Sequence, residues 1–543
     1  MSNGLFRVPT PHNEPIRDYA PGSPERQELK AKLGEMLRRT VEMPAVVGGN
    51  RIRTGNLGEC RCPHDHAHVL GRYHKADETT VRKAIDAALA ARRGWAALPW
   101  EERAAIFLKA AERLSGSWRA TMNAATMLNL SKTAYQAEID AACELTDFLR
   151  FGVANMEEIY RAQPTSSAGC WNRIEQRPLE GFVYAVSPFN FAALAGNLPV
   201  APALMGNVVV WKPASSAVYV AHHVLSLLEE AGLPDGVINM VPGAGATVSG
   251  PVLASPHLAG IHFTVSTTVF QSLWRSVGER IDTYRTYPRL VGETGGKDFI
   301  FAHPSADLEE LSTAIVRGAF EFQGQKCSAA SRAYIPASLW EQLRGMLVDV
   351  VRQIRVGPPT DFTNFVTAVI DKAAFDSIAG YLDYARSAPD AEFVTGGGYD
   401  DSTGYFIEPT IILTTNPRFR TMQEEIFGPV MTVFVYPDDK YSETLRLCDE
   451  TSPYALTGAI FARDRRVIAE ATETLVHAAG NFYVNDKPTG AVVGQQPFGG
   501  SRASGTNDKA GSTINLMKWV SPRTIKENFV APRGFRYPFM AGQ

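Results

Sequence analysis

A single thiol in a small polar turn is the feature of this sequence with the clearest chemical potential. Cys327 follows Phe322-Gln323-Gly324-Gln325-Lys326, and the turn is predicted to begin a helical run. A free thiol has a pKa of about 8.5 and is therefore mostly protonated at neutral pH. A helix N-terminus, the neighbouring Lys326 and a bound cationic cofactor would each favour the reactive thiolate. Taken alone, Cys327 has an ordinary alternative, because cysteine is often simply buried.

Two upstream segments could complete a site for chemistry on a carbonyl group. Glu293 opens Glu293-Thr294-Gly295-Gly296-Lys297, and Asn190 lies in Pro188-Phe189-Asn190-Phe191. A thiol that attacks an aldehyde creates a negative oxygen, which the Asn190 amide and the Cys327 backbone N–H could stabilise. Hydride transfer would leave a thioester, whose hydrolysis needs a base such as Glu293. In isolation, a turn with a solvated carboxylate is the more ordinary interpretation of Glu293.

Length, charge and cysteine usage limit the class of protein. A chain of 543 residues with 45% hydrophobic residues predicts two or three globular domains. Its 54 basic and 57 acidic residues leave no basic excess, so no nucleic-acid partner is expected. The six cysteines are mostly far apart and do not resemble a disulfide framework, which predicts a reducing, cytoplasmic location. Met1-Ser2-Asn3-Gly4 shows neither an apolar signal core nor a transit pattern, which favours the same location.

Two stretches could indicate a metal site and a membrane span. Cys60 and Cys62 precede alternating histidines at 64, 66 and 68, but the spacing matches no closed zinc site and is typical of an exposed strand. No metal is therefore expected. Residues 181–211 carry no charged side chain and are long enough to span a bilayer. Pro188, Pro199 and Pro202 interrupt them, so strands, a loop and a short helix are expected instead of a membrane span.

Apolar runs alternate with helical patterns along most of the chain. Helices are predicted from Asp77 and after Pro99, and a further one over 217–231. Buried strands are predicted at these runs: 181–186, 207–211, 237–241 and 260–264. This alternation indicates a parallel sheet covered on both faces. A second alternating set, from about 298 to 485, predicts a second α/β domain that carries Cys327 at its interface with the first.

The motifs together resemble those of the aldehyde dehydrogenase superfamily over residues 45 to 530. Besides the segments of Asn190, Glu293 and Cys327, the matching stretches are these: Trp211-Lys212-Pro213, residues 231–239, residues 424–430 and residues 454–458. The resemblance implies an α/β protein with a Rossmann-type cofactor domain (1–162 and 182–290) and an α/β catalytic domain (291–510). It also implies a small β oligomerisation arm and tail (163–181 and 511–543), and hence a homo-oligomer, either a dimer or an assembly of dimers.

The resemblance also implies roles for single residues. Cys327, Asn190 and Glu293 match the family's nucleophile, oxyanion donor and base. NAD is the implied cofactor, although neither a G-x-G-x-x-G fingerprint nor a Walker-type loop is present. The matching cofactor residues are Lys212, Ser215, Ser266, Glu425 and Phe427. Ser215 replaces a glutamate that repels the extra phosphate of NADP in many relatives, and Val265 replaces a glycine beside the expected diphosphate position.

Within the superfamily, the chain is most similar to the Δ1-pyrroline-5-carboxylate dehydrogenases. The marks are Thr294, Gln325-Lys326-Cys327-Ser328 and a long C-terminal motif that ends in Gly505-Thr506-Asn507-Asp508-Lys509. The implied substrate is L-glutamate γ-semialdehyde. Its α-carboxylate would meet Ser328 and the backbone at Gly490 and Ala491, since donors to a carboxylate make strong, charge-assisted hydrogen bonds. The other implied substrate residues are Phe191, Phe498 and Glu144.

Three alternatives stay open at this point. The chain could oxidise another small semialdehyde, or it could be an inactive member of the family that only binds ligands. A thiol hydrolase is the third, although no histidine falls in the matched motifs. A proline dehydrogenase partner is also predicted, as a separate protein, because the chain has no room for a second barrel of roughly 250 residues.

Overall fold

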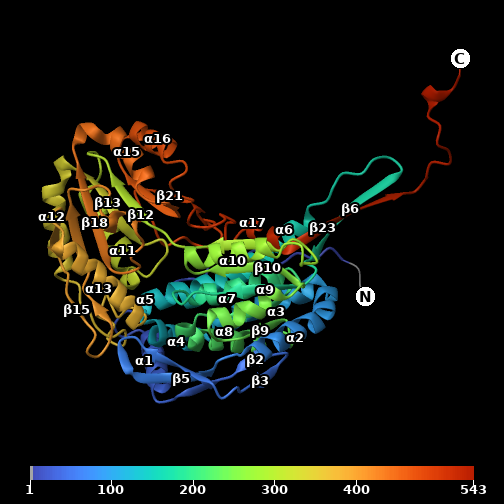
Figure 1. Ribbon diagram of the computed structural model, residues 1–543, viewed down its shortest axis with the longest axis horizontal. Helices are drawn as coiled ribbons and strands as arrows, with labels where there is room; N and C mark the ends of the chain where they lie inside the picture. The colour runs from blue at the N-terminus through green and yellow to red at the C-terminus, as the bar shows by residue number, and fades with distance from the viewer. Residues whose placement is uncertain (1–3, 543) are drawn as a thin grey trace.

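Two seven-stranded sheets organise this protein, which is described here from a computed structural model over residues 4–542 (Figure 1). The first sheet has the strand order β11-β10-β7-β8-β9-β2-β3. Its strands are β2 (Ala45–Val47), β3 (Asn50–Ile52), β7 (Phe182–Val186), β8 (Val208–Lys212), β9 (Ile238–Met240), β10 (Leu258–Thr264) and β11 (Arg289–Glu293). Strands β7 to β11 are parallel. The residues of β7, β8, β9 and β10 are all buried, as helices on both faces of the sheet require.

Six helices in the described part of the chain cover this sheet. They are α2 (Glu78–Ala97), α3 (Trp100–Ser115), α7 (Ala192–Leu204), α8 (Val218–Ala231), α9 (Gly245–Ala254) and α10 (Thr267–Glu279). Four of them, α2, α3, α7 and α8, lie where the sequence predicts them. Helix α2 begins at Asp77, whose carboxylate accepts the Thr80 N–H at 2.7 Å. The charge-free stretch 181–211 forms β7, a loop, α7 and β8, as predicted. Within residues 4–542, no helix combines the length and the apolar character that crossing a bilayer needs.

The strand order reverses between β7 and β10. From β7 the chain moves outward through β8 and β9, and then returns to the other side of β7 for β10 and β11. Loops at the carboxyl ends of parallel strands diverge at such a reversal and leave a crevice for ligands. The loops after β7 and β10 therefore mark the expected cofactor edge.

The second sheet has the order β14-β17-β18-β13-β12-β20-β21 and is parallel except for β14. Its strands are β12 (Asp298–Ala302), β13 (Ala330–Pro336), β14 (Ala391–Thr395), β17 (Thr410–Thr414), β18 (Val430–Tyr436), β20 (Thr457–Phe461) and β21 (Asn481–Val484). The main helices around it are α11 (Leu308–Phe320), α12 (Ala337–Val351), α13 (Lys372–Ser387), α15 (Tyr441–Glu450) and α16 (Arg465–Thr474). The predicted second α/β unit is thus confirmed.

The helix predicted to begin at Cys327 is absent. Helix α11 ends at Phe320, the 3₁₀ turn η3 (Glu321–Gly324) follows, and Cys327 lies in the loop that leads into β13. The prediction was wrong because the conformation of this loop depends on contacts with Ser131, Ala368 and Ile370, which lie far away in the sequence. Cys327 therefore has no helix N-terminus to stabilise a thiolate.

The histidine-rich stretch forms a hairpin instead of an exposed strand. Strands β4 (Leu57–Cys62) and β5 (Asp65–His74) pair antiparallel, and β5 also pairs with β1 (Val41–Met43). Cys60 and Cys62 are buried in an apolar cluster with α1 (Pro24–Leu37) and α4 (Arg119–Leu130). Among residues 4–542, no three His, Cys, Asp or Glu side chains gather as a metal site would require.

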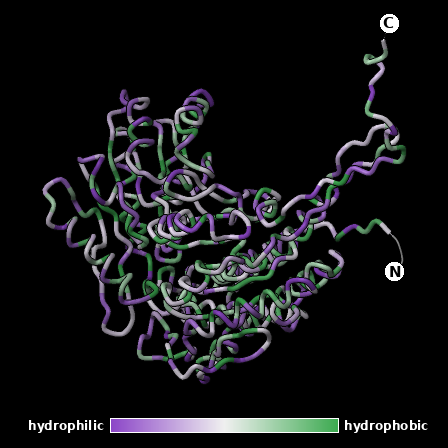
Figure 2. The backbone as a smooth tube through the Cα atoms, turned by 45° about the vertical axis from the view of Figure 1, so that its right-hand side comes forward, coloured by the Kyte–Doolittle hydropathy of each residue, from purple (hydrophilic) through white to green (hydrophobic). Residues whose placement is uncertain are grey.

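A two-stranded ribbon projects from the body of the molecule. Strands β6 (Cys170–Pro178) and β23 (Val520–Asn528) pair antiparallel over nine residues each and extend beyond the two sheets (Figure 1). Figure 2 shows mixed polar and apolar residues along this ribbon. The short helices α17 (Thr513–Leu516) and η5 (Met517–Trp519) precede β23 and bury Trp519 in the core of the first sheet.

Candidate functional site

The loop that carries Cys327 is held in a strained backbone conformation. Phe322 and Gln323 have left-handed φ angles of 52° and 55°, and Gly324 has 65°. A Cβ atom on Gly324 would lie 2.3 Å from the Gly428 carbonyl oxygen, so only glycine fits there. Left-handed backbone at non-glycine residues costs free energy and persists only where the surroundings impose it.

Two buried glutamine side chains impose this conformation. The Gln323 amide donates to the carbonyl oxygens of Ser131 (3.1 Å) and Ala368 (2.8 Å). The Gln325 side-chain oxygen accepts the Ile370 N–H at 2.9 Å. The loop before Cys327 is therefore tied to segments far away in the sequence, which presents the half-buried thiol in one orientation.

Asn190 reaches this loop from the first sheet. It lies in the loop between β7 and α7, is buried, and donates from its amide nitrogen to the Gln325 carbonyl oxygen at 3.0 Å. An asparagine amide has two N–H groups, so one stays available for an oxygen near Cys327. The neighbouring Phe189 packs edge-to-face on Phe427, with the ring centroids 5.8 Å apart.

Gly295 and Gly296 let three loops meet at close distance. A Cβ on Gly296 would lie 2.1 Å from the Cys327 carbonyl oxygen, and one on Gly295 would lie 2.5 Å from a Glu425 carboxylate oxygen. The Gly296 N–H donates to Glu425 at 2.9 Å. Glu293, the last residue of β11 and the predicted base, lies two residues before Gly295 and is thereby brought to the loop of Cys327 and to Glu425.

Burial and negative charge dominate the electrostatics of the site. Burial raises the pKa of Glu293 to about 8, with Lys509 opposing the shift and Asp508 adding to it. The pKa of the Cys327 thiol is raised well above its ordinary value by burial and by Glu293, Asp298 and Glu425. Lys326, which the sequence suggested as a thiolate partner, pairs with Glu321 at 3.4 Å instead. Cys327 is therefore a neutral thiol in the free chain, and it must lose its proton before the sulfur can attack.

The cofactor candidates lie on the loops around the reversal point of the first sheet. Lys212 ends β8, and burial lowers its pKa to about 8. The only polar contact of its ammonium group within the described residues is the Pro213 carbonyl at 3.3 Å. Ser266 caps α10 without a side-chain hydrogen bond, so the first-turn N–H groups of this helix are free to bind a diphosphate. Val265 is 39% exposed and Ser215 is exposed in the turn η2 (Ser215–Ala217).

A buried ammonium group, an uncapped helix start and the carboxylate of Glu425 suit a dinucleotide. Burial also raises the pKa of Glu425 to about 7, and its contact with Gly296 places it beside the loop of Cys327. Phe427, with a left-handed φ of 57°, lies two residues further on, before β18. The donor set at this edge therefore fits NAD.

Several of the substrate candidates contact the loop that carries Cys327. The buried Ser328 hydroxyl is 2.8 Å from the Thr489 hydroxyl, which joins the loop of Cys327 to the turn of Gly490 and Ala491. Gly490 has a φ of 95°, a conformation that favours glycine. Phe191 packs edge-to-face on Phe322 at 6.5 Å. For Phe498, the described contacts are backbone hydrogen bonds with Ala510, and its ring is half-buried.

Two buried charges that support Asn190 and Phe191 were not predicted. The Lys132 ammonium group lies 3.9 Å from the Phe191 ring centre and 4.3 Å from that of Phe322. It pairs with Asp140 at 2.8 Å, and Asp140 also accepts the N–H groups of Ala192 (3.0 Å) and Ala193 (2.9 Å). Asp140 thus caps α7 from outside. In the sequence, both residues look like ordinary charges on a solvated helix, so no signal distinguished them.

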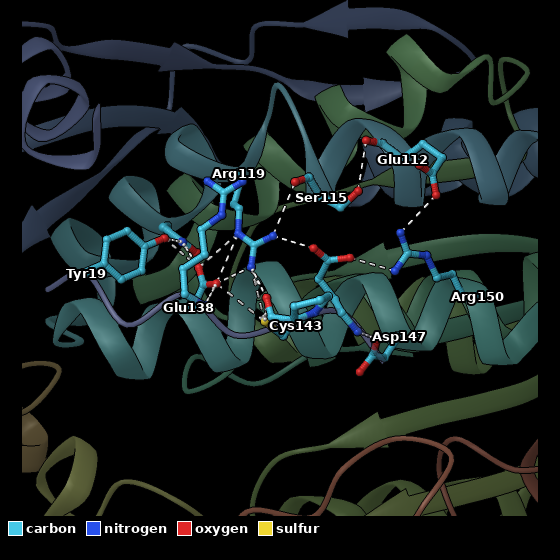
Figure 3. Close-up of polar contacts among 12 residues, drawn as sticks. Tyr19, Glu112, Ser115, Arg119, Glu138, Cys143, Asp147 and Arg150 are labelled. Carbon is cyan, nitrogen blue, oxygen red and sulfur yellow. Dashed lines mark hydrogen bonds and ion pairs between the residues drawn. The ribbon is translucent and has the colours of Figure 1, made fainter. Parts of the chain in front are cut away.

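Glu144 ends a π-helix, η1 (Glu138–Glu144), between α5 (Ala134–Ala137) and α6 (Leu145–Arg161). Burial raises its pKa to about 8, and Asp140 adds to the shift while Lys132 opposes it. The start of the π-helix is anchored by Glu138, which is paired with Arg119 and accepts hydrogen bonds from Tyr19 (2.7 Å) and Asn123 (2.7 Å) (Figure 3). This buried network fixes the start of the π-helix that ends at Glu144, whose carboxylate is also influenced by the charge of Lys326.

Comparison with known proteins places this geometry in a family. The aldehyde dehydrogenase family pattern matches residues 53–525. The chain is 52% identical to the mitochondrial delta-1-pyrroline-5-carboxylate dehydrogenase of Dictyostelium discoideum, over 98% of this chain and 96% of that protein. It is 49% identical to the mitochondrial human enzyme of the same name, over 97% and 94%. A crystal structure of the delta-pyrroline-5-carboxylate dehydrogenase from Mycobacterium tuberculosis bound with NAD is 51% identical, covers both chains fully and superposes with a TM-score of 0.97.

The same comparison corrects the predicted cytoplasmic location. Both eukaryotic relatives above, and those from Danio rerio and Bos taurus, are named mitochondrial enzymes. The prediction was wrong because it depended on cysteine usage. A low number of scattered cysteines indicates a reducing compartment instead of an oxidising one. It carries no information on which reducing compartment holds the protein.

Proposed function

Because the chain belongs to the aldehyde dehydrogenase family, we propose that it oxidises L-glutamate γ-semialdehyde, which forms from Δ1-pyrroline-5-carboxylate, to L-glutamate with NAD. The observation that carries the substrate assignment is the hydroxyl pair of Ser328 and Thr489, which joins the nucleophile loop to the turn at Gly490. Hydroxyl and backbone N–H groups gathered next to a thiol suit an aldehyde that also carries an α-carboxylate.

The roles we assign follow the order of the reaction. The Cys327 thiol loses its proton to water and its sulfur attacks the aldehyde carbon, while the amide of Asn190 and the backbone N–H of Cys327 donate to the oxygen that becomes negative. A bound NAD would supply the hydride acceptor, and loss of hydride from the acyl carbon leaves a thioester on Cys327. Glu293 then takes a proton from water, and the water oxygen bonds to the acyl carbon. The C–S bond breaks, which releases the carboxylate and returns the thiolate.

Replacement of Asn190 by alanine is expected to lower kcat by roughly 10²-fold, the usual effect of losing one oxyanion donor. The interaction forms only as charge develops, so KM should change little. Steady-state kinetics of the purified variant with pyrroline-5-carboxylate would measure both values. A change confined to KM would make Asn190 a binding residue instead of an oxyanion donor.

Replacement of Ser328 by alanine is expected to be selective for the natural substrate. One charge-assisted hydrogen bond to the α-carboxylate contributes about 1.5 to 3 kcal/mol, so kcat/KM for pyrroline-5-carboxylate should fall roughly 10- to 100-fold. Propionaldehyde never uses that donor and should react almost as it does with the parent enzyme. Equal losses on both substrates would show that Ser328, through Thr489, supports only the loop of Cys327. Phe191, Phe498 and Glu144 complete the proposed substrate site.

One assay tests the proposed function as a whole. Cofactor reduction is measured with pyrroline-5-carboxylate, succinic semialdehyde, acetaldehyde and glutaraldehyde, each with NAD and with NADP. The highest kcat/KM is expected for pyrroline-5-carboxylate with NAD. A preference for another semialdehyde would overturn the substrate assignment, and comparable rates with NADP would show that Ser215 leaves room for the extra phosphate. Turnover of an amide without cofactor would favour a thiol hydrolase. The absence of turnover with every substrate would favour an inactive binding protein.

We also propose a homo-oligomer, a dimer or an assembly of dimers, together with a proline dehydrogenase partner. Aromatic side chains beyond the β6–β23 ribbon are largely exposed: Phe529 64%, Phe535 78%, Tyr537 67% and Phe539 84%. Apolar surface concentrated on a projecting segment is expected to be covered by another chain. A monomeric mass by light scattering would contradict the oligomer, and the absence of co-purifying proline dehydrogenase would count against the partner.

A further inference from the structure

The general base of the proposed reaction lies at the end of an edge strand. Strand β11 is the last strand of the first sheet and pairs only with β10 on one side. Edge strands open more easily than central ones, because half of their backbone groups lack a strand partner. Glu293 is the terminal residue of this strand, so its position depends on whatever holds the open side.

The segment from Ala503 to Lys509 covers that open side. Gly505 forms an isolated antiparallel bridge with Glu293, and a Cβ on Gly505 would lie 2.2 Å from the Gly292 carbonyl oxygen. The Thr506 N–H donates to the Gly292 carbonyl at 2.9 Å, and the Thr294 N–H donates to the Ser504 carbonyl at 3.1 Å. Backbone contacts thus hold the residues on both sides of Glu293.

Two threonine hydroxyls lock these backbone contacts. The Thr506 hydroxyl accepts the Gly292 N–H at 3.0 Å and donates to the Asp508 carboxylate at 2.6 Å. The same hydroxyl lies 3.2 Å from the Gly292 carbonyl oxygen, and Asp508, its closer acceptor, is buried and paired with Lys518 at 2.9 Å. The Thr294 hydroxyl donates to the Ala503 carbonyl at 2.6 Å.

The other end of the segment is anchored in the second sheet. The Lys509 ammonium group donates to the carbonyl oxygens of Gly480 (2.8 Å) and Gly499 (3.0 Å), next to the start of the edge strand β21. The Ala503 carbonyl also accepts the Thr267 hydroxyl at 2.9 Å, in the first turn of α10. The segment therefore joins the strand of Glu293 to the second sheet and to the cofactor edge.

We propose that the 503–509 segment is a clamp that positions Glu293 for hydrolysis of the acyl-enzyme, with Thr294, Thr506 and Asp508 as its positioning residues. This inference rests on the proposed role of Glu293 as the base. The clamp also gives a structural role to two separate sequence motifs, Thr294 and Gly505-Thr506-Asn507-Asp508-Lys509. Their hydroxyl and backbone groups meet around Glu293. The attack on the aldehyde and the hydride transfer do not need the base and should depend little on the clamp.

Thr506→Val keeps the side-chain shape while it removes the hydroxyl contacts with Gly292 and Asp508. Displacement of a catalytic group by about 1 Å can cost on the order of 10²-fold, so the steady-state rate is expected to fall 10- to 100-fold. The pre-steady-state burst of NADH should stay within about threefold of the parent rate, and intact-protein mass spectrometry should show the acylated chain accumulating. Thr506→Ser, which keeps the hydroxyl, should restore deacylation to within about threefold. Thr294→Val should show the same split more weakly, because it removes one hydrogen bond.

The matched control is Thr414→Val, which removes a buried hydroxyl that donates to the Asp390 carbonyl at 2.8 Å, in strand β17 next to the edge strand β14 of the second sheet. It should leave both phases unchanged. Equal losses in burst and steady-state rates for Thr506→Val, or no rescue by Thr506→Ser, would overturn the clamp. An unchanged rate of deacylation in both Thr506→Val and Thr294→Val would also overturn the clamp. If the parent enzyme fails to oxidise pyrroline-5-carboxylate, the proposed substrate fails, and the clamp is tested with any aldehyde that the parent does oxidise.

Discussion

Replacement of Cys327 by serine is expected to reduce dehydrogenase turnover by at least about 10³-fold, with no burst of NADH, because the alcohol has too high a pKa to supply the nucleophile. Folding and NAD binding should be nearly unchanged, since the loop is held by Gln323 and Gln325 and not by the sulfur. Stopped-flow absorbance with pyrroline-5-carboxylate, together with the thermal shift caused by NAD, measures the two properties separately.

Cys170→Ser is the matched control for this substitution. Cys170 is another free, half-buried cysteine, and it lies on the projecting ribbon. The control should retain parental activity. Residual turnover of more than a few per cent in Cys327→Ser would exclude a thioester mechanism, whatever the control shows.

Replacement of Glu293 by glutamine is expected to separate the two halves of the reaction. Only hydrolysis of the thioester needs the base, so a stoichiometric burst of NADH should be followed by a steady state that is slower by about 10²- to 10⁴-fold. Rapid-mixing kinetics and the mass of the acylated chain would measure the burst and the trapped intermediate. A steady state at the parental rate would remove Glu293 from this role.

The pH dependence offers a second check on Glu293. Burial raises the pKa of this carboxyl group to about 8, and only the deprotonated form can accept a proton from water. The rate of deacylation in the parent enzyme should therefore increase as pH rises towards about 8 and level off above it. Glu293→Gln should lose that dependence. If the variant keeps the same pH profile, the titration belongs to another group.

Much of the fold was predictable because local patterns and burial agree. The apolar runs that became β7 and β8 are buried on both faces, and residues that recur at helical spacing, such as Val81 and Ile85, form the buried face of α2. The charge-free stretch 181–211 forms strands, a loop and a short helix as expected, although Pro199 and Pro202 lie inside that helix. The Cys327 loop was predicted wrongly, because its left-handed residues are stabilised by Ser131 and Ala368, which no local window includes.

The amino-acid sequence by itself determined the family and the candidate chemistry, since the motifs around Asn190, Glu293 and Cys327 depend only on residue types and order. Only the tertiary structure decided which charges are buried and what they hold. Lys132 and Asp140 support the loop of Asn190, and Asp508 supports the strand of Glu293, through contacts between segments that lie far apart in the chain. The same burial turns Cys327 into a neutral thiol and raises the pKa of Glu293. Desolvation depends on every neighbour in space, and sequence distance does not reveal those neighbours.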